Sequence, residues 1–121
     1  MTWLWVALAG GVGAVLRHLA HTGAQHAGWR SPWATLAVNV LGSFALGLLV
    51  GWGSRLVSPE VTLVLGTGLL GGFTTFSTAS AESAELWRDG RRWAAVRLAG
   101  GMLLLCVLAC LLGARLVAFL P

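Results

Sequence analysis

The chain has 121 residues, of which 57% are hydrophobic and 10% are charged. Soluble domains carry about 25% charged residues, so this composition excludes a soluble fold and predicts an integral membrane protein. The formal net charge is +4, and every basic residue is an arginine near the end of an apolar segment. This placement favours anchoring in the lipid headgroup layer over the basic face of a nucleic-acid-binding protein. We therefore expect a lipid bilayer, and no nucleic acid, as the partner of this surface.

The first apolar segment is expected to form a helix from Trp3 to about Ala20, with Thr2 as its N-cap. Because Met1 leads directly into this segment without basic residues, we expect the helix to stay in the membrane and not to be cleaved as a signal peptide. Arg17 is expected to close the helix at headgroup level. A strip of small residues would let another helix approach its backbone closely: Gly10, Gly11, Gly13 and Ala14.

The sequence contains few metal ligands. His18 and His21 are spaced for one helix face, and with His26 they could bind a metal in principle, but no acidic or cysteine residue lies nearby. We therefore expect these histidines in the headgroup layer. Cys106 and Cys110 lie four positions apart within the last apolar segment, where a disulfide is sterically disfavoured, so we expect them to be packing residues.

Ser31 and Pro32 form a helix start signal, an N-cap followed by proline at the first helical position. The second helix is expected to begin near Trp33 and to end near Gly53. Asn39 is its one strong polar side chain, and an amide at membrane depth is costly unless it is paired. We expect Asn39 to face either another helix or a water-filled path. The same helix carries small residues that favour tight packing: Gly42, Ser43, Gly47 and Gly51.

A second start signal stands at residues 58–60, which read Ser-Pro-Glu. From Pro59 to Asp89 a single straight helix would be about 46 Å long, well beyond a hydrocarbon core of about 30 Å. Near its middle stands GGFTTFSTA, residues 71–79, where glycines and hydroxyl side chains weaken a helix. We therefore predict two half-helices, about 60–70 and 77–88, that meet near the membrane midplane.

Gly90 is expected to stop the third segment, and the last helix should extend from about Trp93 to Val117. Gly100 and Gly101 give this helix a second notch for close packing. The loops between segments are too short for a soluble domain. The predicted fold is an all-α integral membrane protein with four transmembrane helices, the third of them broken, in a single domain over residues 1–121.

A broken helix in a membrane exposes backbone groups that can bind ions. Free carbonyls at the end of the first half suit a small cation, and free N–H groups at the start of the second half suit an anion. Phe76 adds an aromatic ring with a weakly positive edge, and Asn39 adds an amide donor. The residues alone thus indicate an ion or small-solute site, and they favour an anion.

Three strings in this chain resemble the CrcB/Fluc family of fluoride channels: GGVGAVLRH at 10–18, NVLGSFALG at 39–47 and GGFTTFST at 71–78. The resemblance covers nearly the whole chain. It implies an antiparallel dual-topology dimer with two narrow fluoride pathways and a structural sodium ion at the dimer centre. The implied role is passive export of fluoride across the plasma membrane, which lowers its cytoplasmic concentration and gives fluoride resistance.

The resemblance also implies roles for individual residues. The backbone carbonyls of Gly71 and Thr74 match the sodium ligands of the family. Positions that match the fluoride pathway are Asn39, Phe76, Thr75, Ser77 and Thr78, of which the last three would complete its hydroxyl lining. Glu82 matches a vestibule acid.

The chain departs from the family pattern at two places. Ala79 stands where a second pathway phenylalanine is usual. The last helix lacks serines near the pathway, and the corresponding stretch contains Gly100, Gly101, Met102 and Leu105. Both changes remove pathway chemistry and leave the sodium positions intact.

The arginines are distributed unevenly. If the first and third loops lie on one side of the membrane, that side receives Arg17, Arg30, Arg88, Arg91, Arg92 and Arg97, and the other receives Arg55 and Arg115. The positive-inside rule then predicts that both termini lie outside the cytoplasm. A homodimer inserted in both orientations should show little bias, so we also consider a heterodimer with a second, oppositely oriented family member and one degraded pathway.

Two other functions remain to be weighed. A small multidrug-type exporter needs a titratable carboxylate in the membrane, usually in the first helix, where this chain has none. A purely structural subunit would use its glycine faces for packing alone. An enzyme is not expected, since the sequence lacks a nucleophile with a base at a suitable spacing, a metal-ligand cluster and a phosphate loop.

Overall fold

The computed structural model describes residues 1–53 and 55–121, which are helical apart from short connections. The elements follow in the order α1 (Thr2–His26), α2 (Ser31–Leu56), α3 (Pro59–Leu63), the π-helical segment η1 (Val64–Leu70), α4 (Gly71–Phe73), α5 (Phe76–Arg88) and α6 (Arg92–Ala118). Four stretches are long and apolar enough to cross a membrane: Thr2–His26, Ser31–Gly53, Pro59–Arg88 and Arg92–Ala118. The prediction of an all-α protein with four membrane-spanning stretches is confirmed.

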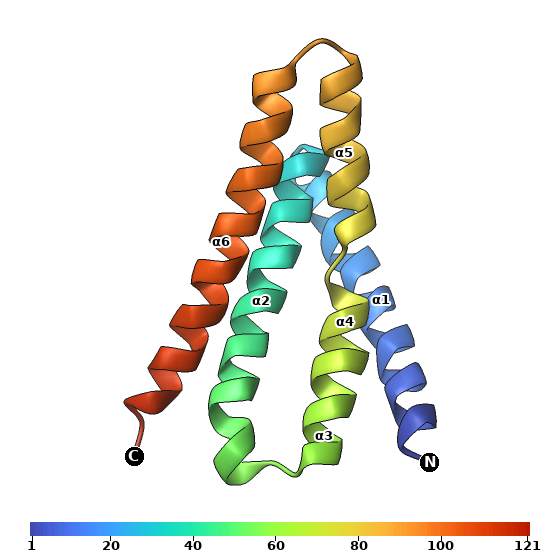
Figure 1. Ribbon diagram of the computed structural model, residues 1–121. Coiled ribbons are helices and arrows are strands. Elements are labelled where there is room, and N and C mark those ends of the chain that lie inside the picture. The colour runs from blue at the N-terminus through green and yellow to red at the C-terminus, as the bar shows by residue number, and fades with distance from the viewer.

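Helix α2 lies between α6 on one side and the third stretch on the other (Figure 1). Helix α6 packs along α2 and α5, and α1 packs against η1 and α4. Both termini lie at the lower end of the view, and the turn between α5 and α6 lies at the upper end. The third stretch therefore contacts three helices: α1 at η1 and α4, α2 along its length, and α6 at α5.

Glycines set the distance between α2 and α6. A methyl group at Gly47 would overlap the carbonyl of Cys110, and a methyl group at Gly113 would overlap the carbonyl of Phe44. The two backbones are therefore in direct contact, as small residues allow in membrane helix pairs. The two cysteines remain free thiols.

The buried side chains are few and mostly small. Ala34, Thr35 and Val38 of α2 are at most 3% exposed, and Met102 of α6 is 6% exposed. Most large apolar side chains face outward instead. Small residues inside and large apolar residues outside are expected where lipid tails, and not water, surround the helices.

Helix α1 is longer than predicted. It ends at His26 and not near Ala20, and its N-cap position is Met1, with Thr2 as the first helical residue. The apolar run ends at Leu19, but the helix continues for about two further turns, in which His21 contacts the Ser31 and Thr35 hydroxyls of α2. As a result Arg17 lies well inside α1 and not at its end.

Helix α2 also differs at both ends. Its N-cap position is Arg30, and Ser31 is the first helical residue. The Ser31 hydroxyl does not cap the helix and instead donates to Glu82 Oε1 at 2.7 Å. At the other end α2 continues to Leu56, past the expected stop near Gly53.

The third stretch begins as predicted, since the Ser58 hydroxyl accepts a hydrogen bond from the Val61 N–H at 3.3 Å. Residues 71–73 remain helical, in contrast to the predicted half-helix end near 70, and α5 begins at Phe76. Only Thr74 and Thr75 separate the two helical parts; we call them the Thr74–Thr75 link. The π-helical segment η1 was not predicted, because hydrophobic periodicity does not separate π from α geometry.

The end of α5 agrees with the sequence. Gly90 follows it with φ of 78°, a left-handed conformation that favours glycine, which confirms the predicted stop. Helix α6 extends one residue further than predicted at each end, from Arg92 to Ala118.

Candidate ion pathway beside the Thr74–Thr75 link

The link is extended backbone between two helical parts. Thr74 has φ −79° and ψ 158°, and Thr75 has φ −143° and ψ 116°. The hydroxyl of Thr74 donates back to the Leu70 carbonyl at 3.0 Å. The hydroxyl of Thr75 caps α5, because its oxygen accepts the Thr78 N–H at 3.2 Å. The Thr75 side chain thus satisfies an N–H at the start of α5, and the Thr74 hydroxyl adds a second bond to a carbonyl that also accepts the Thr74 N–H.

Asn39 of α2 binds the backbone of Thr75 in two directions. Its Oδ1 accepts the Thr75 N–H at 2.8 Å, and its Nδ2 donates to the Thr75 carbonyl at 3.0 Å. The amide nitrogen also contacts Met102 Sδ at 3.3 Å, and the residue is 7% exposed. Asn39 therefore bonds to the third stretch, and it also lines the groove described below.

Arg17 of α1 also binds the Thr74–Thr75 link, a contact that was not predicted from the sequence. Its Nη1 donates to the Thr74 carbonyl at 3.1 Å. The expectation that Arg17 closes the first helix is therefore wrong, because α1 continues beyond it to His26 and packs against α4. The available signal was its spacing, since Arg17 follows Gly10 and Gly13 on one helix face.

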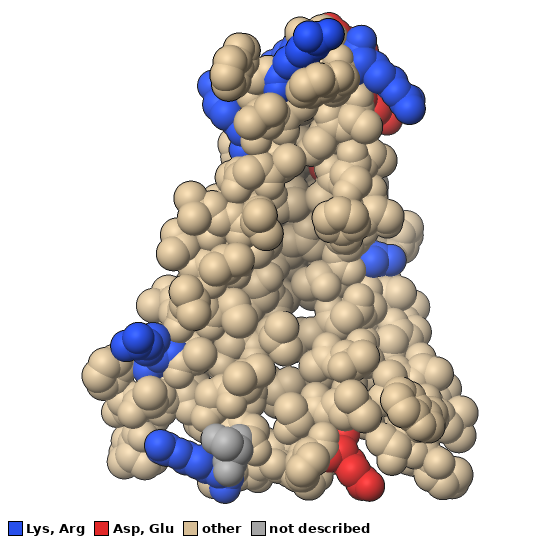
Figure 2. Space-filling model, viewed as in Figure 1, with Lys and Arg blue, Asp and Glu red and all other residues tan. Residues whose placement is uncertain are grey.

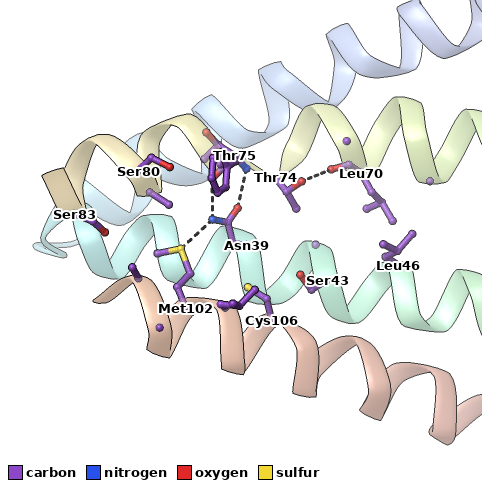
Figure 3. A pocket seen from close by; sticks show the side chains of 18 residues that line it. Asn39, Ser43, Leu46, Leu70, Thr74, Thr75, Ser80, Ser83, Met102 and Cys106 are labelled. Atoms are coloured by element: carbon purple, nitrogen blue, oxygen red, sulfur yellow. Dashed lines mark hydrogen bonds between the residues drawn. The ribbon is translucent and has the colours of Figure 1, made fainter. Parts of the chain in front are cut away.

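A groove of about 700 Å³ runs beside the link, between α2, the third stretch and α6 (Figure 3). Its walls are mainly apolar, with polar atoms from Asn39, Ser43, Thr75, Ser80 and Ser83. In Figure 3 Asn39 and Thr75 face each other across dashed hydrogen bonds at one side of the groove. The groove is therefore an apolar passage with a short polar segment.

The residues singled out from the sequence divide into two groups. Those that line the groove are Asn39, Gly71, Thr74, Thr75, Phe76 and Ala79. The side chains of Ser77 and Thr78 turn to Thr75 Oγ1, at 3.3 and 3.1 Å. Phe76 is 89% exposed, so its ring projects from the single chain at the groove edge.

Glu82 lies in a separate polar cluster that joins α1, α2 and α5. Its Oε1 accepts hydrogen bonds from Ser31 Oγ at 2.7 Å and from Thr35 Oγ1 at 2.9 Å. Nε2 of His21 lies 3.3 and 3.4 Å from these two hydroxyl oxygens. In the tautomer that carries its proton on Nε2, His21 can donate to these oxygens while both hydroxyls donate to Glu82.

Oε2 of Glu82 is buried and has no hydrogen-bond partner. Within residues 1–53 and 55–121 no group of three or more histidines, cysteines or acids could hold a metal ion. His21 contacts the hydroxyls of Ser31 and Thr35 on α2.

Comparison with known families matches residues 4–114 to the family described as CrcB-like protein, Camphor Resistance (CrcB). The chain belongs to the CrcB family. The three strings on which the resemblance rested all lie inside the matched range. The identification of the family from those strings is therefore confirmed.

Named relatives of this CrcB-family chain agree with the match. A protein of Chelativorans sp. is 53% identical over 94 residues, which cover 75% of each chain, and is named fluoride-specific ion channel FluC. Relatives with the same name are 42% identical in Mesorhizobium japonicum, over 98% of this chain and 97% of the relative, and 47% identical in Magnetococcus marinus, over 90% and 91%. The similarity thus extends over nearly the full length.

The family and the fold together define the class of this CrcB-family chain. It is a multi-pass protein of the plasma membrane, as its four spans and its relatives indicate. It belongs with ion channels and not with enzymes, since its relatives are named as channels.

Proposed function

We propose that this chain is a subunit of a fluoride channel that lets fluoride leave the cytoplasm passively and so lowers its concentration there. The observation that carries the proposal is the extended Thr74–Thr75 link, which borders an apolar groove and is held there by Asn39. Relatives over nearly the whole chain are named fluoride-specific ion channels. In this proposal the link lies near the membrane midplane.

The pathway follows the groove. Asn39 and Thr75 supply its polar segment, and Phe76 presents a ring edge that can approach an anion without a conventional hydrogen bond. Helix α5 begins at this point, so its positive dipole end adds to the attraction of an anion. Ser77 and Thr78 support the hydroxyl of Thr75. Glu82 acts at the vestibule, one to two turns further along α5.

A second, antiparallel copy or a second family member would cover the groove. Phe76 is 89% exposed, and methyl groups at Gly100 and Gly101 would meet no atom within 4 Å in the single chain. Phe76 and Gly100 line the same groove, and such an exposed surface with a small residue is suited to close helix packing. The dimer would then enclose a pathway that one chain leaves open.

We infer that the backbone carbonyls of Gly71 and Thr74 hold a structural sodium ion in the dimer. In a continuous helix the Gly71 carbonyl would accept the Thr75 N–H, but that N–H donates to Asn39 Oδ1. The Gly71 oxygen is thereby available as a ligand, and the Thr74 carbonyl keeps one lone pair beside its bond to Arg17. Carbonyl oxygens suit a hard cation, and two copies supply four. When bound, the ion would hold the two links together.

A heterodimer is the second candidate, and charge favours it. Five arginines lie on the side of the α1–α2 and α5–α6 connections: Arg30, Arg88, Arg91, Arg92 and Arg97. Arg55 and Arg115 lie on the other side, and Figure 2 shows basic side chains gathered at the upper end. Arg17 no longer counts toward the bias, because it binds the link. Five arginines on one side against two on the other still favour a single orientation of the chain in the membrane. Ala79, which lines the groove in place of a phenylalanine, agrees with a heterodimer in which one pathway is degraded.

Fluoride efflux from proteoliposomes, followed with an ion-selective electrode, tests the proposal. The purified chain alone should release fluoride, and both Asn39→Asp and Phe76→Ile should reduce the release, while Arg115→Gln on α6 serves as the control. Release only after addition of a second family member would support the heterodimer. No fluoride release in either case would refute the proposal.

A small multidrug-type exporter makes a different prediction in the same vesicles. Its transport would require a pH gradient and would be lost with Glu82→Gln. Passive fluoride release that does not need a pH gradient would exclude this mechanism. A purely structural subunit would leave fluoride release unaltered by Phe76→Ile in any complex.

A further inference from the structure

Helix α1 touches the third stretch at backbone distance just before the link. A methyl group at Gly13 would overlap the Leu69 carbonyl and lie 2.9 Å from the Phe73 nitrogen. A methyl group at Gly72 would overlap the Gly10 carbonyl. The glycine face of α1 therefore fixes the position of this helix against η1 and α4.

Arg17 stands one turn beyond Gly13 on the same face of α1, which places its guanidinium beside the link. Its Nη1 donates to the Thr74 carbonyl at 3.1 Å. In a continuous helix this carbonyl would accept the Thr78 N–H, but that N–H donates to Thr75 Oγ1. The carbonyl thus needs a donor from outside the third stretch, and Arg17 supplies it.

The bonds from Arg17 and Asn39 hold opposite sides of one peptide group. The carbonyl of Thr74 and the N–H of Thr75 belong to the same peptide plane, and every peptide bond in the described residues is trans. In a trans peptide these two groups point in opposite directions. Arg17 therefore holds the plane from α1, and Asn39 holds it from α2 at 2.8 Å.

We propose that Arg17 is a positioning residue of the channel, which fixes the rotation of the Thr74–Thr75 peptide and so the direction of the Thr74 carbonyl and of the chain leading to Phe76. The role in conduction rests on the proposed fluoride channel. The two bonds to this peptide group, from Arg17 and from Asn39, are together called the clamp. The clamp does not depend on the proposed function.

Arginine suits this role for physical reasons. Charge within a membrane span is costly unless it is paired, so the guanidinium gains from a carbonyl partner at this depth. Its bond to the carbonyl is charge-assisted, and its long planar head is weakly hydrated. Lysine retains the charge and a donor on a slightly shorter chain. Methionine has a similar stem and no donor.

Two variants and a control test the proposal: Arg17→Lys, Arg17→Met and Arg97→Met. Arg97 is exposed on α6 and serves as the matched control. The first readout is amide hydrogen exchange over residues 70–80 of the folded, detergent-solubilised protein. Loss of a charge-assisted bond should raise exchange there by about tenfold or more in Arg17→Met, with other segments unchanged. Arg17→Lys should restore most of the protection.

The second readout is the current through single channels in a planar bilayer. This current does not depend on how much protein folds, so a merely stabilising role would leave it unchanged. We expect a fall of roughly tenfold in Arg17→Met and a substantial recovery in Arg17→Lys. If Arg17→Met does not fold, Arg17→Gln, whose amide is too short to reach Thr74, replaces it.

The outcomes separate this proposal from the proposed function. If the unmodified chain conducts no fluoride alone or with a partner, the proposed function fails, and hydrogen exchange still tests the clamp. If exchange over residues 70–80 in Arg17→Met matches Arg97→Met within about twofold, the clamp is refuted. If exchange rises and the single-channel current does not fall, Arg17 shapes the fold and not the pathway, and the proposal is overturned.

Discussion

Replacement of Asn39 by leucine tests the central contact of the site. Leucine has a similar branched shape but neither donor nor acceptor, so the Thr75 N–H and carbonyl would both lose the partners that Asn39 provides at 2.8 and 3.0 Å. Asn39 is 7% exposed, so water cannot easily replace these bonds. Each buried polar group left without a partner costs about 1–3 kcal/mol, which gives about 2–6 kcal/mol for the pair.

The assay is thermal unfolding in detergent, followed by tryptophan fluorescence. For a chain of this length 1 kcal/mol corresponds to about 4 °C, so Asn39→Leu should lower the melting temperature by about 8–24 °C. Ser43→Ala is the matched control, since Ser43 lines the same groove on α2 and is half-buried. It should melt close to the unmodified chain. An Asn39→Leu protein that melts as the control does would refute the assignment of these two bonds as stabilising.

Three further substitutions follow from the packing. Gly13→Ala forces α1 away from the third stretch and should lower the free energy of unfolding, measured by thermal melting, by about 1–3 kcal/mol. Gly23→Ala is the control, since a methyl group there meets open space, and equal melting of the two variants would contradict the backbone contact at Gly13. Gly101→Ala should weaken dimer formation in a dilution experiment without lowering monomer helicity, and an unchanged dimer would place the interface elsewhere. Thr35→Val removes the hydrogen bond from Thr35 to Glu82 and should lower the free energy of unfolding by about 1–3 kcal/mol. An unchanged free energy of unfolding would contradict this hydrogen bond.

The sequence predicted most of the fold because bilayer constraints are simple. Apolar segments long enough to span about 30 Å, separated by arginines and start signals, identify four spans without any tertiary information. The Ser58 cap and the Gly90 stop were also predictable, since both act within a few residues of the chain. The end of α1 was not predictable, because a helix beyond its apolar run is stabilised by contacts with other segments.

The candidate site was predictable as a stretch and not as a geometry. The string GGFTTFSTA identified the region, and Asn39 was recognisable as a polar side chain that needs a partner. Which of the surrounding groups would pair with the link could not be read from the string. Glu82 was singled out, but its partner Ser31 was interpreted as a helix cap, and nothing in the sequence pointed to its second partner, Thr35.

The sequence by itself determined that this is a four-span membrane protein with a weak point in its third span, because composition, periodicity and local hydrogen-bonding preferences act within single segments. Only the tertiary structure decided how that weak point is held. Arg17 and Asn39 lie far from Thr74 and Thr75 in the chain, and they meet at one peptide group because glycines let α1 approach the third stretch and the buried α2 lies beside it. A charge that looked like a membrane anchor thereby becomes a partner of the link, since a buried carbonyl without a helical donor must find one elsewhere.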